Sequence, residues 1–145
     1  MKLLIAILLA ISATHVMALP SSREILELHK SAIAHHKDLI ELAKFSRGPD
    51  QDRTGRLMKL SQELLGTVNN VTDMIHILSL VTNDADKKAI LSYIKEKLSL
   101  TVRELDFHIK EVNLEASNVQ GTALVSAADK LKTDIRTLQT MIASP

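Results

Sequence analysis

Apolar residues recur at steps of three and four along separate stretches of the chain, which is the spacing of one helix face. These stretches predict four amphipathic helices, over residues 22–46, 54–81, 86–119 and 122–142. The segment 47–53 is charged and contains a Gly-Pro pair, so we expect a loop there. Because short connections favour antiparallel neighbours, the sequence predicts an all-α, antiparallel up-down four-helix bundle.

The third predicted helix organises this arrangement. It is the longest helical pattern without Pro or Gly, and at 1.5 Å per residue it would be roughly 50 Å long. Asn83 and Asp84 offer acceptors for its first amides, and Gly121 stands where a left-handed residue could close it. We expect the other helices to pack around it. It is over-long for the fourth helix and would overhang that helix unless it bends, splits or dimerises.

A second apolar row lies on the same helix, roughly opposite its buried face. Its members stand seven residues apart, so they form one slowly drifting stripe: Tyr93, Leu100, Phe107 and Leu114. We expect charged flanks of Lys88, Lys95 and Asp106 on one side and Lys97, Glu104 and Glu111 on the other, with Glu96 and Arg103 interrupting the stripe.

Two interpretations of this row stay open. Either the helix is central and contacts neighbours on two sides or merely exposes scattered apolar residues, or the row is a surface for a protein partner, a second copy or a membrane. The second interpretation makes these four residues the candidate partner-binding site.

The second and fourth helices carry further expectations. Gly66 and the pair Asn69-Asn70 should weaken the middle of the second helix, because Gly costs about 1 kcal/mol relative to Ala there. Its end, residues 74–81, is apolar nearly all round and should be covered on several sides. On the fourth helix we expect the charged residues to face water: Lys130, Lys132, Asp134 and Arg136.

Residues 1–18 have the pattern of a secretory signal peptide. Lys2 precedes an apolar run that is shorter than the roughly 20 residues of a membrane span, and Ala18 occupies a suitable cleavage position. We therefore expect cleavage after Ala18, a secreted or periplasmic protein, and one domain over residues 19–145. Asn70 begins a glycosylation sequon, which matters only in a eukaryotic secretory route.

The composition argues against several classes of protein and of site. Removal of Lys2 with the signal peptide leaves as many Lys and Arg residues as the 17 acidic residues, which argues against a nucleic-acid binder. The absence of Cys excludes disulfides, thiolate metal sites and cysteine nucleophiles.

Histidines are the one suggestive chemical feature. His29 and His36 fall near the middle of the first helix's apolar face, with His35 to one side. A di-iron bundle needs a Glu-x-x-His motif on each of two helices, and no Glu stands three residues before any His here. We therefore expect packed histidines bonded to backbone or Ser, with no metal site, no cofactor and no catalytic residue.

Taken together, these patterns favour an exported, non-enzymatic interaction or structural protein with a protein partner or a second copy of itself. The alternative is a carrier that encloses a fatty acid or another lipid, with Met58, Met74 and Met141 as adaptable core residues.

Overall fold

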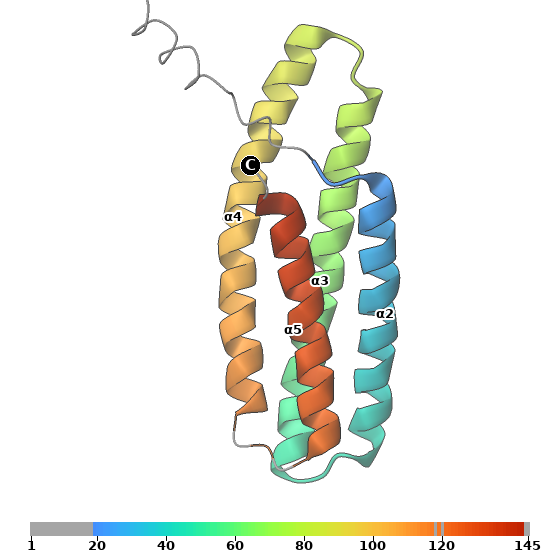
Figure 1. Cartoon of the computed structure of the whole chain (residues 1–145), viewed down its shortest axis with the longest axis vertical. Helices are drawn as coiled ribbons and strands as arrows, with labels where there is room; N and C mark the ends of the chain where they lie inside the picture. Colours follow the sequence, from blue (N-terminus) through green and yellow to red (C-terminus); the bar gives the residue numbers. More distant parts are fainter. Residues whose placement is uncertain (1–18, 118, 120, 144–145) are drawn as a thin grey trace, which may run out of the picture.

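The computed structural model describes residues 19–117, 119 and 121–143, and the predicted signal peptide lies outside them. Its helices are α2 (Ser22–Phe45), α3 (Pro49–Leu80), α4 (Asp84–Ala116) and α5 (Thr122–Ala143), and no strand occurs among the described residues. Consecutive helices run in opposite directions and are joined by short turns (Figure 1). The predicted all-α, antiparallel four-helix bundle is confirmed.

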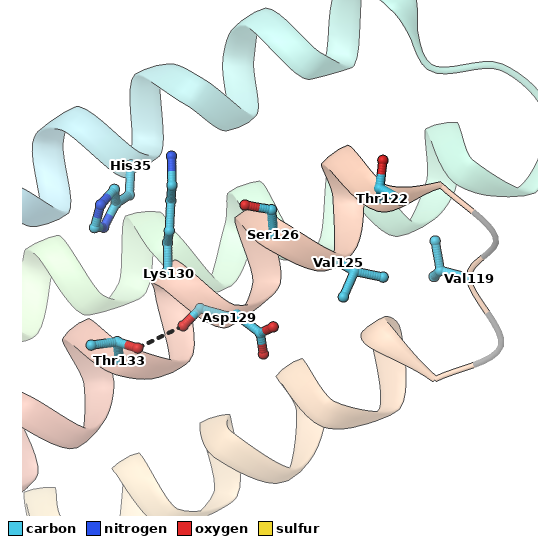
Figure 2. Close-up of a pocket in the computed structure, with 8 residues that line it drawn as sticks. All are labelled: His35, Val119, Thr122, Val125, Ser126, Asp129, Lys130 and Thr133. Carbon is cyan, nitrogen blue, oxygen red and sulfur yellow. Dashed lines mark hydrogen bonds between the residues drawn. The ribbon is translucent and has the colours of Figure 1, made fainter.

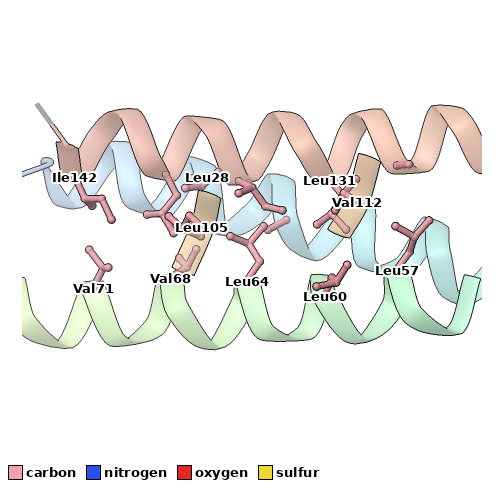
Figure 3. Close-up of a cluster of buried hydrophobic side chains, with 14 of the residues drawn as sticks. Leu28, Leu57, Leu60, Leu64, Val68, Val71, Leu105, Val112, Leu131 and Ile142 are labelled. Atoms are coloured by element: carbon pink, nitrogen blue, oxygen red, sulfur yellow. The ribbon is translucent and has the colours of Figure 1, made fainter. Parts of the chain in front are cut away.

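Aliphatic side chains from all four helices fill the space between them (Figure 3). Leu39 of α2, Leu64 of α3, Leu105 of α4 and Ile135 of α5 are each 0% exposed. Burial of one such side chain contributes about 1.5–3 kcal/mol. In a chain without disulfides, this core holds the bundle together.

The helices occupy the four corners of the bundle, and α4 is not central. α4 packs against α3 and α5, and α2 packs against the same two helices. α3 and α5 also contact each other across the bundle, whereas the described backbones of α2 and α4 do not approach each other. The expectation that the other helices surround the third predicted helix is therefore wrong. Its fully buried residues form one narrow face, because a corner helix needs to cover only the core: Ile94, Leu98, Leu105 and Val112.

Local signals set most helix ends. Ser21 and Glu24 form the predicted capping box, and the Asn83 side chain accepts from the amides of Ala85 and Asp86, as predicted. Two boundaries differ by three residues or more. α3 begins at Pro49 rather than residue 54, since Pro is well suited to the first helical position. α4 spans 84–116, and Ser117 rather than Gly121 caps its end.

The long pair α3 and α4 projects beyond the start of α2 and the end of α5 (Figure 1). α3 runs unbroken through Gly66 and the pair Asn69-Asn70, where we expected a kink or fraying. Its end is not covered as expected, because Ile77 is 52% and Leu80 66% exposed. The overhang predicted for one helix is thus shared by two, and its outer surface is open.

Candidate functional site

The apolar row predicted as a partner site faces solvent on α4. Tyr93 is 57%, Leu100 45%, Phe107 59% and Leu114 69% exposed. Neighbouring helices do not cover these side chains, so the interpretation in which α4 uses a second apolar face for internal packing is wrong. We call these four residues the α4 stripe. At 1.5 Å per residue the stripe runs along about 32 Å of helix.

Charged side chains border the α4 stripe in a regular pattern. Three and four residues after each of its first three members stands a pair of opposite charges, and these six residues are the flanking charges: Glu96, Lys97, Arg103, Glu104, Lys110 and Glu111. No ion pair or hydrogen bond joins any of them to another described side chain. Lys97 does place its ammonium 5.4 Å from the centre of the Tyr93 ring, in a cation–π contact.

Two other charged residues of α4 form hydrogen bonds with neighbouring helices. Asp106, which we expected beside the stripe, instead accepts from Gln139 of α5 at 2.6 Å. Glu115 accepts two hydrogen bonds from Arg56 of α3, at 2.6 and 2.8 Å. The flanking charges, by contrast with these two carboxylates, surround an apolar row and form no side-chain ion pair or hydrogen bond within the described chain.

A buried polar cluster joins α2 to α5. Asp134 is only 3% exposed, although the sequence predicted that it faces water. Ser31 Oγ donates to its Oδ1 at 2.8 Å, and His35 Nδ1 lies 2.5 Å from its Oδ2. Because a carboxylate only accepts hydrogen bonds, the proton of this second bond is on Nδ1. A buried carboxylate is costly without such partners, so both bonds stabilise the α2–α5 contact.

These three residue types do not form a nucleophilic triad. In a triad the hydroxyl bonds the imidazole and the carboxylate holds the opposite ring nitrogen. Here the Ser31 hydroxyl and the His35 ring both bind the carboxylate of Asp134, so no imidazole is placed to accept the hydroxyl proton. Asp134 therefore acts as a shared acceptor that ties two helices together.

A shallow groove of about 590 Å³ lies beside this cluster (Figure 2). His35 of α2 and Lys130 of α5 line it, together with small and polar side chains of α5. The Lys130 ammonium bonds Asp38 at 2.7 Å, and this bond holds the pKa of the Asp38 carboxyl below its ordinary value, with a smaller contribution from His35. The lining also includes Val119 and Val125 and is mostly apolar, with these paired charges beside it, and the groove is open to solvent.

His36, His29 and His108 take part in packing, whereas His76 of α3 is exposed. His36 Nδ1 lies 3.2 Å from the Ser61 hydroxyl, which agrees with the expectation of a histidine bonded to Ser. His29 is half-buried on α2, and His108 Nε2 of α4 lies 3.4 Å from Glu63. Among the described side chains, no three His, Asp or Glu residues stand close enough together to hold a metal ion.

Within the part of the chain that the structure describes, no helix combines the length and the apolar character needed to span a membrane. Comparisons of the chain with protein-family models, with curated proteins and with solved structures give no match.

Proposed function

We propose that this protein is a non-enzymatic interaction module whose α4 stripe binds an apolar helix. The observation that carries the proposal is the exposure of all four stripe residues, between 45% and 69%, in one row on a rigid helix. Isolated exposed apolar residues are common on soluble proteins. A regularly spaced row of large ones, bordered by charges, is typical of a binding surface.

The surroundings of the stripe support this proposal. α4 is anchored along its opposite face by Ile94, Leu98, Leu105 and Val112, so the stripe is presented by a rigid element. A partner helix that lies along it would cover aromatic and leucine side chains, which supply much of the binding energy in protein interfaces. The flanking charges would then form the polar rim that gives such an interface its orientation.

Site-specific photo-crosslinking tests the proposal. A benzophenone amino acid replaces Leu100 in the protein as exported by its own cell, and a matched control carries it at Lys37, an exposed residue of α2. We expect a defined crosslinked product from position 100 that the control lacks. Equal labelling from both positions would contradict a docking surface on α4. The intact mass of the same preparation tests whether the mature chain begins at Leu19.

The carrier of an apolar ligand is the alternative proposal. It has less support because the interior between the described helices is already occupied by interdigitated aliphatic side chains. Mass spectrometry of an organic extract from the native protein separates the two. A stoichiometric fatty acid or other lipid would favour the carrier, whereas a lipid-free protein that takes up no fluorescent fatty acid would argue against it.

A further inference from the structure

The flanking charges repeat with the same seven-residue period as the α4 stripe. Each repeat consists of one apolar residue, two intervening residues and then two adjacent residues of opposite charge. The three charge pairs are Glu96-Lys97, Arg103-Glu104 and Lys110-Glu111. A coiled-coil seam has two apolar rows per seven residues, and the α4 stripe supplies one such row with charges on both of its borders.

The two charges of each pair lie on opposite sides of the stripe. Successive residues of an α-helix point about 100° apart and differ by only 1.5 Å in height. The first row of flanking charges therefore borders one side of the stripe, and the second row borders the other. The first row comprises Glu96, Arg103 and Lys110, and the second row comprises Lys97, Glu104 and Glu111.

We propose that a second copy of this chain occupies the α4 stripe, with the two α4 helices parallel. The inference rests on the proposed docking function and names its partner. In a parallel pair related by a two-fold axis, the first row of one copy faces the second row of the other. Glu96 then meets Lys97, Arg103 meets Glu104, and Lys110 meets Glu111 across the interface, so every contact on both sides joins opposite charges.

An antiparallel pair fits the same charges less well. Each row would then face the same row of the second copy in reverse order, which pairs Glu96 with Lys110 and Lys97 with Glu111. At its centre, however, Arg103 would meet Arg103 and Glu104 would meet Glu104. Like charges placed opposite each other oppose association, so the charge pattern selects the parallel arrangement.

This self-complementarity also accounts for charges that the monomer does not use. Some carboxylates elsewhere on the surface bind partners on neighbouring helices, as Asp38 binds Lys130 and Glu115 binds Arg56. The flanking charges have no such partner among the described residues, and each obtains one of opposite sign in the parallel pair.

Reversal of one row at a time tests the proposal. The first variant reverses the first row with Glu96→Lys, Arg103→Glu and Lys110→Glu, and the second reverses the second row with Lys97→Glu, Glu104→Lys and Glu111→Lys. In either variant alone, every contact of the parallel pair joins like charges. When the two variants are mixed, every contact again joins opposite charges. The mixture also controls for folding, because a misfolded variant would not bind the other variant.

Sedimentation velocity at low salt gives the expected result. The mature wild-type chain dimerises. Each variant alone dimerises on the order of a hundredfold more weakly, since exposed ion pairs each contribute a few-fold, and the equimolar mixture recovers wild-type affinity. Phe107→Glu disrupts the dimer as well, because it places a charge within the apolar row.

The remaining outcomes separate this inference from the proposed function. Variants that each dimerise as tightly as the wild type would overturn the parallel pair, because reversal of one row leaves the antiparallel charge contacts unchanged in sign. A monomeric wild type whose position 100 crosslinks to a different protein would overturn the second copy as partner and leave the docking function intact. A monomer without a specific crosslink would overturn both.

Discussion

At the scale of single residues, the spacing of Asp134 predicts burial, whereas its charge suggests exposure. It stands three residues after Leu131 and four before Leu138, both of which are buried, so its position belongs to the apolar face of α5. We assigned it to water because it is charged. Ser31 and His35, one turn apart on α2, form the hydrogen bonds that the buried carboxylate of Asp134 needs. They lie about 100 residues away in the sequence, so no local pattern predicts these bonds.

The Asp134 cluster gives the first prediction. We expect Asp134→Ala to lower the free energy of unfolding by about 2–3 kcal/mol, because Ser31 and His35 each lose a hydrogen bond to a charged acceptor. Urea denaturation followed by circular dichroism measures the change. Asp129→Ala is the matched control, since this carboxylate is 58% exposed and should matter by less than about 0.5 kcal/mol. Equal effects of the two substitutions would refute a stabilising cluster.

Asp38 gives a prediction for acid pH. The hydrogen bond from Lys130 holds its folded pKa below the ordinary value of 3.8, so the pair stabilises the folded state above that pH. The stabilisation is lost as the pH falls through the lower folded pKa. We therefore expect Asp38→Asn to be slightly less stable than wild type at pH 6 and to approach it below pH 3.8. Melting temperatures measured between these conditions check this, and a difference independent of pH would exclude the ion pair as its cause.

At the scale of helices, sequence signals located the elements well where a side chain itself makes the cap. Ser21, Glu24 and Asn83 are such residues, and all three cap as predicted. We placed Pro49 in a loop because a Gly-Pro pair often occurs in loops. A Pro followed by acidic residues such as Asp50 and Asp52 also suits the first turn of a helix. The spacing of apolar residues identified the inner face of α4, but spacing alone does not specify which helix covers it.

Two glycines of opposite conformation test these helix assignments. Gly48 precedes α3 with φ +56°, which other residues adopt only with strain, so Gly48→Ala should destabilise the protein by about 1–2 kcal/mol. Gly66 is inside α3, and an added Cβ there meets no atom within 4 Å, so Gly66→Ala should stabilise by about 0.5–1 kcal/mol. Urea midpoints measure both. A loss of stability from Gly66→Ala would mean that α3 is not a regular helix at this point.

At the scale of the whole molecule, the number of helices and their up-down order followed from periodicity. Which helices are neighbours did not follow from it. The sequence led us to place α4 at the centre because it is longest, but length has no bearing on the number of neighbours. The α4 stripe was visible in the sequence because its period is regular. Only the structure shows that the stripe is exposed, since the same row could equally have packed against another helix.

The projecting end of α3 and α4 divides the molecule into regions of different stability. The last fully buried residue of α3 is Val71 and the first of α4 is Ile94, so the hairpin between them lacks a core of its own. Local opening costs least where few buried apolar contacts are broken. We expect the amides of residues 75–90 to exchange hydrogen faster than those around Leu64 and Leu105.

A matched pair of leucine truncations makes this difference measurable. Leu64 is 0% exposed at the centre of the bundle, so Leu64→Ala should lower the free energy of unfolding by about 2–5 kcal/mol and accelerate exchange throughout the chain. Leu78 is half-buried in the projecting end, where the hairpin can open by itself. Leu78→Ala should therefore accelerate exchange within residues 75–90 and change the urea midpoint little. If Leu78→Ala instead accelerated exchange throughout the chain and lowered the global stability as much as Leu64→Ala does, the hairpin would belong to the same cooperative unit as the core. Its open outer surface would then be as rigid as the α4 stripe.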